Sequence, residues 1–203
     1  AVWHFNGIVW EEYTYRDPVI NDNITYTSVW GTSSNDLYLG NGGGKIIHWN
    51  GSKASVLNSF DGTSITDISG DKDVGIYVTG SKNTTSGSNL VAFYNFENWQ
   101  VISNPFVNAT YPKSIKIFDA NFVLLGGNNL FIKYTSDWEY ILLNNTGSIS
   151  KIRGNRSNNI FCVGFFKEAY HFNGLEWYLY TELKSSHGVF NSVFVTDSKV
   201  FIV

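Results

Sequence analysis

Five short apolar runs, rich in β-branched and aromatic residues, recur along the chain. They lie at residues 37–39, 76–78, 122–125, 160–163 and 200–203. Runs of this length and composition are typical of β-strands that are covered on both faces. No segment has a convincing helical period, so the pattern predicts an all-β protein.

Turn signals and tryptophans recur at matching places around these runs. Two-residue hairpin signals stand at Asn6-Gly7, Asn50-Gly51 and Asn173-Gly174, where a type I′ turn needs positive φ at both central positions. The last strand of each unit opens at Trp10, Ala54, Trp99, Trp138 or Trp177. Each unit therefore reads as four strands joined by tight turns.

The spacing of the units identifies the architecture. The glycines that end the second strand are Gly40, Gly80, Gly126 and Gly164, at intervals of 40, 46 and 38 residues. Periods of about 40–45 residues with four strands per unit are the signature of a β-propeller.

The two ends of the chain read as two halves of one further unit. Residues 189–203 resemble the first two strands of a unit, and residues 1–22 resemble the last two. We therefore expect one domain, residues 1–203, folded as a five-bladed propeller of four-stranded antiparallel blades. The blades lie at about 23–62, 63–108, 109–148, 149–188, and 189–203 plus 1–22. A ring closed by this shared blade leaves no open sheet edge between its ends.

Composition and charge narrow the class of partner. The net charge of −3 argues against nucleic-acid binding, which depends on basic surfaces. No run approaches the ~18 apolar residues of a membrane span, so we expect no membrane insertion. Charged residues make only 15% of the chain and no Met is present. These features favour an extracellular or periplasmic setting and a mature or excised piece of a larger protein.

One repeat carries a resemblance to a known class. The residues Trp30-Gly31, Ser34-Asn35-Asp36-Leu37-Tyr38, Gly40 and Ile47-His48-Trp49-Asn50-Gly51 resemble the repeat of secreted bacterial β-propellers of a kelch-like or sialidase-like type. The pattern departs from the Asp-box consensus and lacks the kelch double glycine in most units. It is similar to five-bladed lectins of the tachylectin kind only in blade count. The resemblance implies binding more often than chemistry.

Histidine and cysteine give no sign of a metal or catalytic site. His4, His48 and His171 recur at one repeat position, where the other units carry Phe93 and Lys133, so we expect them to serve the scaffold. Cys162 lies in an apolar run, as expected of an inert buried thiol. No zinc-type spacing is present. We therefore expect neither a metal nor a cofactor.

The innermost strand of each blade offers a candidate ligand site. Alignment on Val29, Ile68, Ile117, Ile152 and Val193 places Ser28, Asp67, Lys116, Lys151 and Ser192 in the preceding column. One interpretation is a solvated channel lining without a ligand. The other is an anion-accepting funnel that binds its ligand through Asp67, Lys116 and Lys151.

A second candidate lies in one turn between the second and third strands. Most of these turns are rich in Gly and Asn, but one reads Phe165-Phe166-Lys167-Glu168. Either the two aromatics extend the strand or fill the core, or they form a platform for a sugar or peptide.

Together these features favour a non-catalytic module that binds a glycan or a protein on its loop-rich face or at the channel mouth. A structural or interaction domain of a larger secreted protein is the alternative. A glycosidase is a third hypothesis, but it needs two carboxylates facing each other across the site. Because the inner column offers only Asp67, we expect no enzymatic activity.

Overall fold

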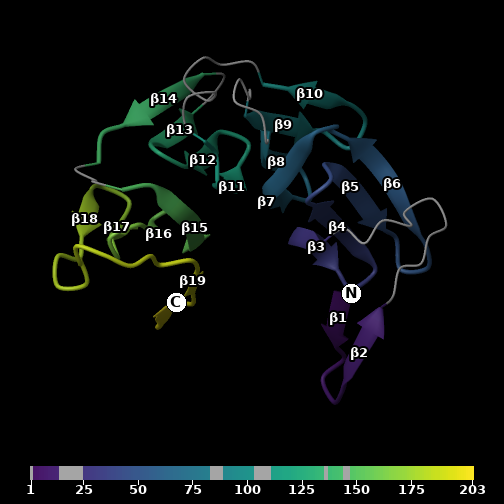
Figure 1. The fold of residues 1–203 in the computed structure, drawn as a ribbon, viewed down its shortest axis with the longest axis horizontal. Coiled ribbons are helices and arrows are strands. Elements are labelled where there is room, and N and C mark those ends of the chain that lie inside the picture. The colour runs from purple at the N-terminus through teal and green to yellow at the C-terminus, as the bar shows by residue number, and fades with distance from the viewer. Residues whose placement is uncertain (1, 14–24, 83–88, 103–110, 135–136, 144–146) are drawn as a thin grey trace.

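The computed structural model describes residues 2–13, 25–82, 89–102, 111–134, 137–143 and 147–203. This part of the chain contains strands and turns and no helix, so the prediction of an all-β protein is confirmed. The strands form antiparallel sheets arranged in an arc, with the first strand of each sheet on its inner side (Figure 1).

Four sheets of four strands make up the body of the arc. Each has its strands in chain order, as in a propeller blade. The first two blades contain β3 (Tyr26–Ser33), β4 (Asp36–Asn41), β5 (Lys45–Trp49) and β6 (Ala54–Ser59), then β7 (Thr63–Asp71), β8 (Gly75–Lys82), β9 (Leu90–Tyr94) and β10 (Trp99–Val101). The next two contain β11 (Ser114–Asp119), β12 (Phe122–Gly126), β13 (Leu130–Tyr134) and β14 (Trp138–Ile141), then β15 (Ile149–Arg156), β16 (Asn159–Gly164), β17 (Ala169–Phe172) and β18 (Trp177–Leu179).

The two ends of the arc are sheets of only two strands. β1 (Val2–Phe5) pairs with β2 (Trp10–Tyr13), and β19 (Val193–Val195) pairs with β20 (Val200–Ile202). The expected closed ring is therefore not formed, because in the described chain neither pair joins the other. Figure 1 shows the two half-blades at opposite ends of the open arc.

Apolar clusters between neighbouring blades hold the curvature of the arc. Each of the three junctions between complete blades is filled by buried side chains from both sheets. A fourth cluster joins the β15–β18 blade to β19, through Phe161 and Val193. Close packing of this kind resists deformation, so the angle between blades is a property of their cores.

Two glycines allow neighbouring blades to approach closely. A Cβ atom on Gly40 would lie 2.5 Å from Ile65 Cγ2, and one on Gly126 would lie 2.8 Å from Ile149 Cγ2. Both isoleucines belong to the innermost strand of the following blade. The repeated glycine therefore serves blade packing at these two positions.

Ring contacts between the second and third strands recur in all four complete blades, and three of the four pairs are stacked. The pairs are Tyr38 with His48, Tyr77 with Phe93, Phe122 with Tyr134, and Phe161 with His171. The scaffold role expected for His48 and His171 is confirmed. The assignment of Lys133 to this column is wrong by one residue, because Tyr134 is the residue opposite Phe122. In a strand of period two, such a slip places the two side chains on opposite faces.

The repeated tryptophan position was predicted correctly. Trp10, Ala54, Trp99, Trp138 and Trp177 each open the outermost strand of their sheet. Their burial differs, however: Trp138 is buried, Trp99 and Trp177 are half-buried, and Trp10 is 65% exposed. The repeat position determines which strand the residue begins. The packing of the neighbouring sheet determines how deeply its side chain is buried.

Candidate functional site

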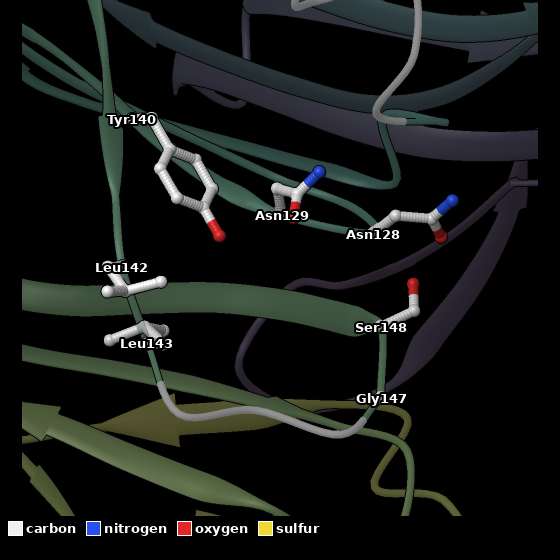
Figure 2. Close-up of a pocket in the computed structure, with 7 residues that line it drawn as sticks. All are labelled: Asn128, Asn129, Tyr140, Leu142, Leu143, Gly147 and Ser148. Atoms are coloured by element: carbon white, nitrogen blue, oxygen red, sulfur yellow. The ribbon is translucent and has the colours of Figure 1, made fainter.

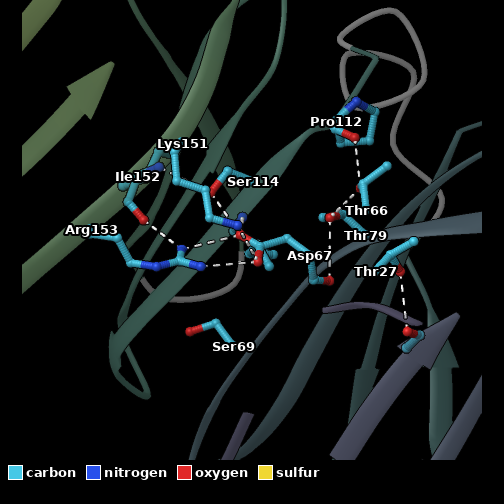
Figure 3. Close-up of polar contacts among 12 residues, drawn as sticks. Thr27, Thr66, Asp67, Ser69, Thr79, Pro112, Ser114, Lys151, Ile152 and Arg153 are labelled. Atoms are coloured by element: carbon cyan, nitrogen blue, oxygen red, sulfur yellow. Dashed lines mark hydrogen bonds and ion pairs between the residues drawn. The ribbon is translucent and has the colours of Figure 1, made fainter. Parts of the chain in front are cut away.

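A cluster of charged side chains lies on the innermost strands of three blades. Asp67 comes from β7, Lys116 from β11, and Lys151 and Arg153 from β15. In β7 and β15 a register irregularity lies immediately before the charged residue, between Ile65 and Asp67 and between Ile149 and Lys151. A bulge of this kind bends the strand and redirects the next side chain. Figure 3 shows Lys151 and Arg153 converging on Asp67.

Asp67 is the centre of this cluster and is only 1% exposed. Lys151 Nζ donates to Oδ1 at 2.9 Å, and the Arg153 guanidinium donates to both carboxylate oxygens at 3.2 Å. Ser114 Oγ and the Ile115 backbone N–H donate to Oδ2 at 2.7 and 3.1 Å. One carboxylate therefore ties together three blades.

The surroundings of Asp67 keep it ionised. Burial alone raises the pKa of this carboxyl group. The charges of Arg153 and Lys151, with hydrogen bonds from Arg153 and Ser114, outweigh burial and hold the pKa below its ordinary value of 3.8. A buried carboxylate that accepts this many hydrogen bonds is a structural anchor, with little capacity left to accept a proton.

Lys116 lies in the same region and is not held by Asp67. Within the described chain it makes no ion pair, and its ammonium lies 5.4 Å from the centre of the Phe118 ring. Burial and the nearby Arg153 charge lower the pKa of Lys116, and the charges of Asp67 and Asp71 act in the opposite direction. The cluster thus contains three cationic side chains around one buried carboxylate.

The predicted column is only partly brought together. Asp67 and Lys151 form the expected ion pair, and Lys116 lies within electrostatic range of both Asp67 and Arg153. Ser28 and Ser192 do not join the cluster. The Ser28 hydroxyl is buried without a hydrogen-bond partner among the described residues. The backbone N–H of Ser192 donates to Val203 O.

Arg153 is the member of the cluster that the sequence did not reveal. It directly follows Ile152, in the column where the other complete blades carry Trp30, Ser69 and Phe118 after Val29, Ile68 and Ile117. Its backbone lies within the inner strand β15. Its long side chain is what reaches the Asp67 carboxylate. The available signal was a charged residue placed directly after a buried inner-strand position.

The aromatic turn after β16 has a defined geometry. Phe166 and Lys167 both have positive φ, at 57° and 53°, and Phe165 forms an isolated bridge with Val189. Phe165 is 38% exposed, but Lys113 Nζ lies 4.4 Å from the centre of its ring. Phe166 lines an open pocket of about 460 Å³ with residues 184–186. The two aromatics therefore have different neighbours, Lys113 at the ring of Phe165 and residues 184–186 at Phe166.

A polar pocket of about 410 Å³ lies between the turn joining β12 to β13 and the segment that runs from β14 to the start of β15. It is lined by Asn128 and Asn129 from the turn between β12 and β13, and by Tyr140, Leu142, Leu143, Gly147 and Ser148 along the connection to β15. Figure 2 shows the Ser148 side chain directed toward Asn128. The Ser148 hydroxyl is buried and has no hydrogen-bond partner within the described chain.

Two further kinds of group could carry chemistry, the thiol of Cys162 and side chains able to bind a metal ion. Cys162 is fully buried, and burial raises the pKa of its thiol. Across the described ranges, no three His, Cys, Asp or Glu side chains lie close enough to hold a metal ion. The same ranges contain no helix with the length and apolar character needed to cross a membrane.

Comparison with known proteins shows the fold. No protein-family model and no curated protein sequence matches the chain. A solved structure described as YCF48 bound to D1 peptide matches with a TM-score of 0.70 and 10% identity, over 97% of this chain and 65% of that chain. YCF48 from Cyanidioschyzon merolae matches with a TM-score of 0.58 and 13% identity, over 79% of this chain and 57% of that chain.

The chain has a propeller-type fold. Its four-stranded antiparallel sheets are blade-like, and both neighbours are β-propellers. The chain spans less than two thirds of the length of either neighbour. The kelch-like or sialidase-like assignment and the secreted setting remain predictions.

Proposed function

We propose that this protein is a non-catalytic, protein-binding propeller module that takes an acidic peptide segment at its inner-strand cluster. The proposal is supported by the fold neighbour that is described as bound to a peptide. At 10% identity that likeness carries the fold alone, so the choice of ligand rests on this chain's own residues.

The observation that carries the proposal is the unbalanced charge of the cluster. Asp67 is saturated by Lys151, Arg153 and backbone or hydroxyl donors. Lys116 remains half-buried without an ion pair in the described chain, and burial disfavours its charged form. A carboxylate from a ligand would restore that charge, because a partly dry surface strengthens ion pairing.

The loop pocket between the third and fourth blades suits the backbone of the same ligand. Asn128 and Asn129 carry amide donors and acceptors, and the Ser148 hydroxyl has no partner among the described residues. We propose that a peptide extends from the cluster toward this face. No comparable feature favours a glycan, because Lys113 covers the ring of Phe165.

The absence of catalysis is part of the proposal. Asp67 is fixed by cations that keep its pKa low, which suits an anchor and not a general acid. An extracellular or periplasmic location and a place within a larger protein are likewise proposed on composition alone.

Isothermal titration with a short glutamate-rich peptide that has a free C-terminal carboxylate tests the function. The same peptide with glutamine for glutamate and an amidated C-terminus is the control ligand. We expect the acidic peptide to bind, and binding to weaken with added salt. Equal binding of the two peptides, or binding only of oligosaccharides on a glycan array, would contradict the proposal.

The variant Lys116→Gln tests whether the acidic peptide binds at this site or responds only to the net charge of the protein. Loss of one charge-assisted contact should weaken the acidic peptide about tenfold or more. Lys72→Gln is the matched control, because Lys72 is fully exposed in a turn and pairs with Asp73. An equal effect of both variants would mean that the peptide responds only to net charge.

A further inference from the structure

The aromatic turn at residues 165–168 borders a second pocket, and we propose that this pocket takes an aromatic side chain of the peptide ligand. The inference rests on the proposed function, because it names a further feature of the same ligand. The ligand is then an acidic segment that also carries an aromatic residue. That residue packs on the ring of Phe166, which selects it.

Two pockets occupy equivalent places in successive blades. The polar pocket lies beside the turn at residues 127–129 and the connection from β14 to β15. The aromatic pocket lies beside the turn at residues 165–168 and the connection from β18 to β19, and is lined by Phe166 and residues 184–186. The repeat therefore builds two cavities of similar size, about 410 and 460 Å³, from the same two structural elements.

The aromatic turn touches both features that the peptide is proposed to use. Gly147 lines the polar pocket (Figure 2). A Cβ atom on Gly147 would lie 2.6 Å from Phe165 Cβ and 3.0 Å from Phe166 Cδ2, so this loop packs directly on the turn. Lys113, whose ammonium lies 4.4 Å from the centre of the Phe165 ring, immediately precedes β11, the strand that carries Lys116. The aromatic pocket is therefore continuous with the proposed peptide surface.

Charged and polar groups at the aromatic pocket are paired with one another. Lys184 Nζ forms an ion pair with Glu168 Oε1 at 2.9 Å, and Glu168 is only 3% exposed. Ser186 Oγ and His187 Nδ1 are hydrogen-bonded at 2.6 Å. With these groups paired, the ring of Phe166 is the surface that a ligand can use. Aromatic rings pack favourably on one another, so the pocket suits an aromatic side chain.

Phe166 is held in a backbone conformation that residues with side chains rarely adopt. Phe166 and Lys167 have φ of 57° and 53°, and they are the only adjacent pair of non-glycine residues with positive φ in the described ranges. The equivalent turns of the first and third blades read Gly42-Gly43-Gly44 and Gly127-Asn128-Asn129, residue types that adopt positive φ readily. Backbone strain of this kind is concentrated at functional sites. The unusual turn therefore supports a role for Phe166 in binding.

Titration of the whole chain with matched peptides tests the aromatic pocket. Each glutamate-rich peptide carries one phenylalanine at a different distance from its glutamates, and its control carries serine at that place. We expect at least one phenylalanine peptide to bind about tenfold more tightly than its serine control. Because the two members of a pair have equal charge, this gain measures the ring alone.

The outcomes separate this inference from the proposed function. If the serine peptides bind and no phenylalanine peptide binds more tightly, the aromatic pocket is overturned and the proposed function stands. If a phenylalanine peptide binds and its serine control does not, the charged cluster fails as the binding surface and the aromatic pocket stands. If neither member of any pair binds, both fail.

Variants of the turn show whether Phe166 produces the gain. Phe166→Asn together with Lys167→Gly removes the ring and supplies residue types that adopt positive φ readily. This double variant should lose the tenfold gain and keep its thermal midpoint, because relief of strain offsets the lost packing. Lys167→Gly alone is the matched control, since it keeps the ring. The control should retain the gain and raise the thermal midpoint by about 2–4 °C.

Two results with these variants would overturn the proposal. One is a gain that survives in the double variant, or that the control loses to the same extent. The other is an oligosaccharide that binds the wild type and the control but not the double variant, because the pocket would then hold a glycan.

Discussion

At the scale of single residues, Asp67 holds the inner surface of the arc together. It receives donors from β11 and β15 as well as lying on β7, so its removal would affect three blades at once. Lys116 makes no ion pair in the described chain, and in the proposed function it is the cation that pairs with a ligand carboxylate. Within this cluster, Asp67 therefore serves the stability of the fold, and Lys116 serves the proposed binding.

Replacing Asp67 should destabilise the fold. Asp67→Asn leaves two cations without their counter-charge, and we expect a loss of about 3–5 kcal/mol in the free energy of unfolding near neutral pH. Urea denaturation measures the loss. Asp73→Asn, at an exposed pair with Lys72, should change stability by less than about 0.5 kcal/mol. Equal effects of the two changes would mean that the buried ion pairs contribute nothing.

The same carboxylate makes stability sensitive to acid. Its folded pKa lies below the ordinary 3.8, so its contribution is present above pH 3.8 and is lost as the pH falls through the folded value. The difference in unfolding free energy between the wild type and Asp67→Asn should therefore shrink at strongly acidic pH. A difference that stays constant on acidification would show that Asp67 is not ionised in the fold.

Binding at Lys116 should have its own dependence on pH. Burial lowers the pKa of Lys116, so it loses its proton at a lower pH than an exposed lysine does. We expect affinity for the acidic peptide to fall as the pH rises toward 10.5, and Lys116→Gln to remove most of that fall. An affinity that stays level over this range would exclude Lys116 as a ligand contact.

At the scale of strands, the tryptophan that opens the outermost strand can be compared between a complete blade and the N-terminal half-blade. Trp138 is 9% exposed and packs edge-on against Tyr77, whereas Trp10 is 65% exposed. Trp138→Ala should reduce the free energy of unfolding by about 3–5 kcal/mol. Trp10→Ala should change it by less than about 0.5 kcal/mol. Chemical denaturation of both variants checks this, and equal losses would mean that the N-terminal half-blade is covered in solution.

Strand identity was readable from the sequence because turns and apolar runs obey local rules. The tryptophans open the predicted strands, and the apolar runs form the second strand of each sheet. Exact register was not readable. The slip between Lys133 and Tyr134, and the irregularity before Asp67, depend on how two strands pair. Arg153 was missed for a related reason, because reach across blades depends on side-chain length and not on repeat position.

At the scale of the whole molecule, the number of repeats did not decide whether the ring closes. Four complete blades and two half-blades are compatible with five units, yet the described chain forms an open arc. Closure depends on the angle between blades, which the junction cores set. That angle is a sum over many packed side chains, and no local pattern in the sequence records it.

Hydrogen exchange of the whole chain, with and without the glutamate-rich peptide, tests the central claim that the inner-strand cluster is a peptide-binding surface. The account predicts that the peptide slows exchange in residues 114–119 and 149–156, and in the loop at 127–129. Lys116→Gln should abolish this protection. Protection confined to the turn at residues 165–168, or no change on adding the peptide, would contradict the account.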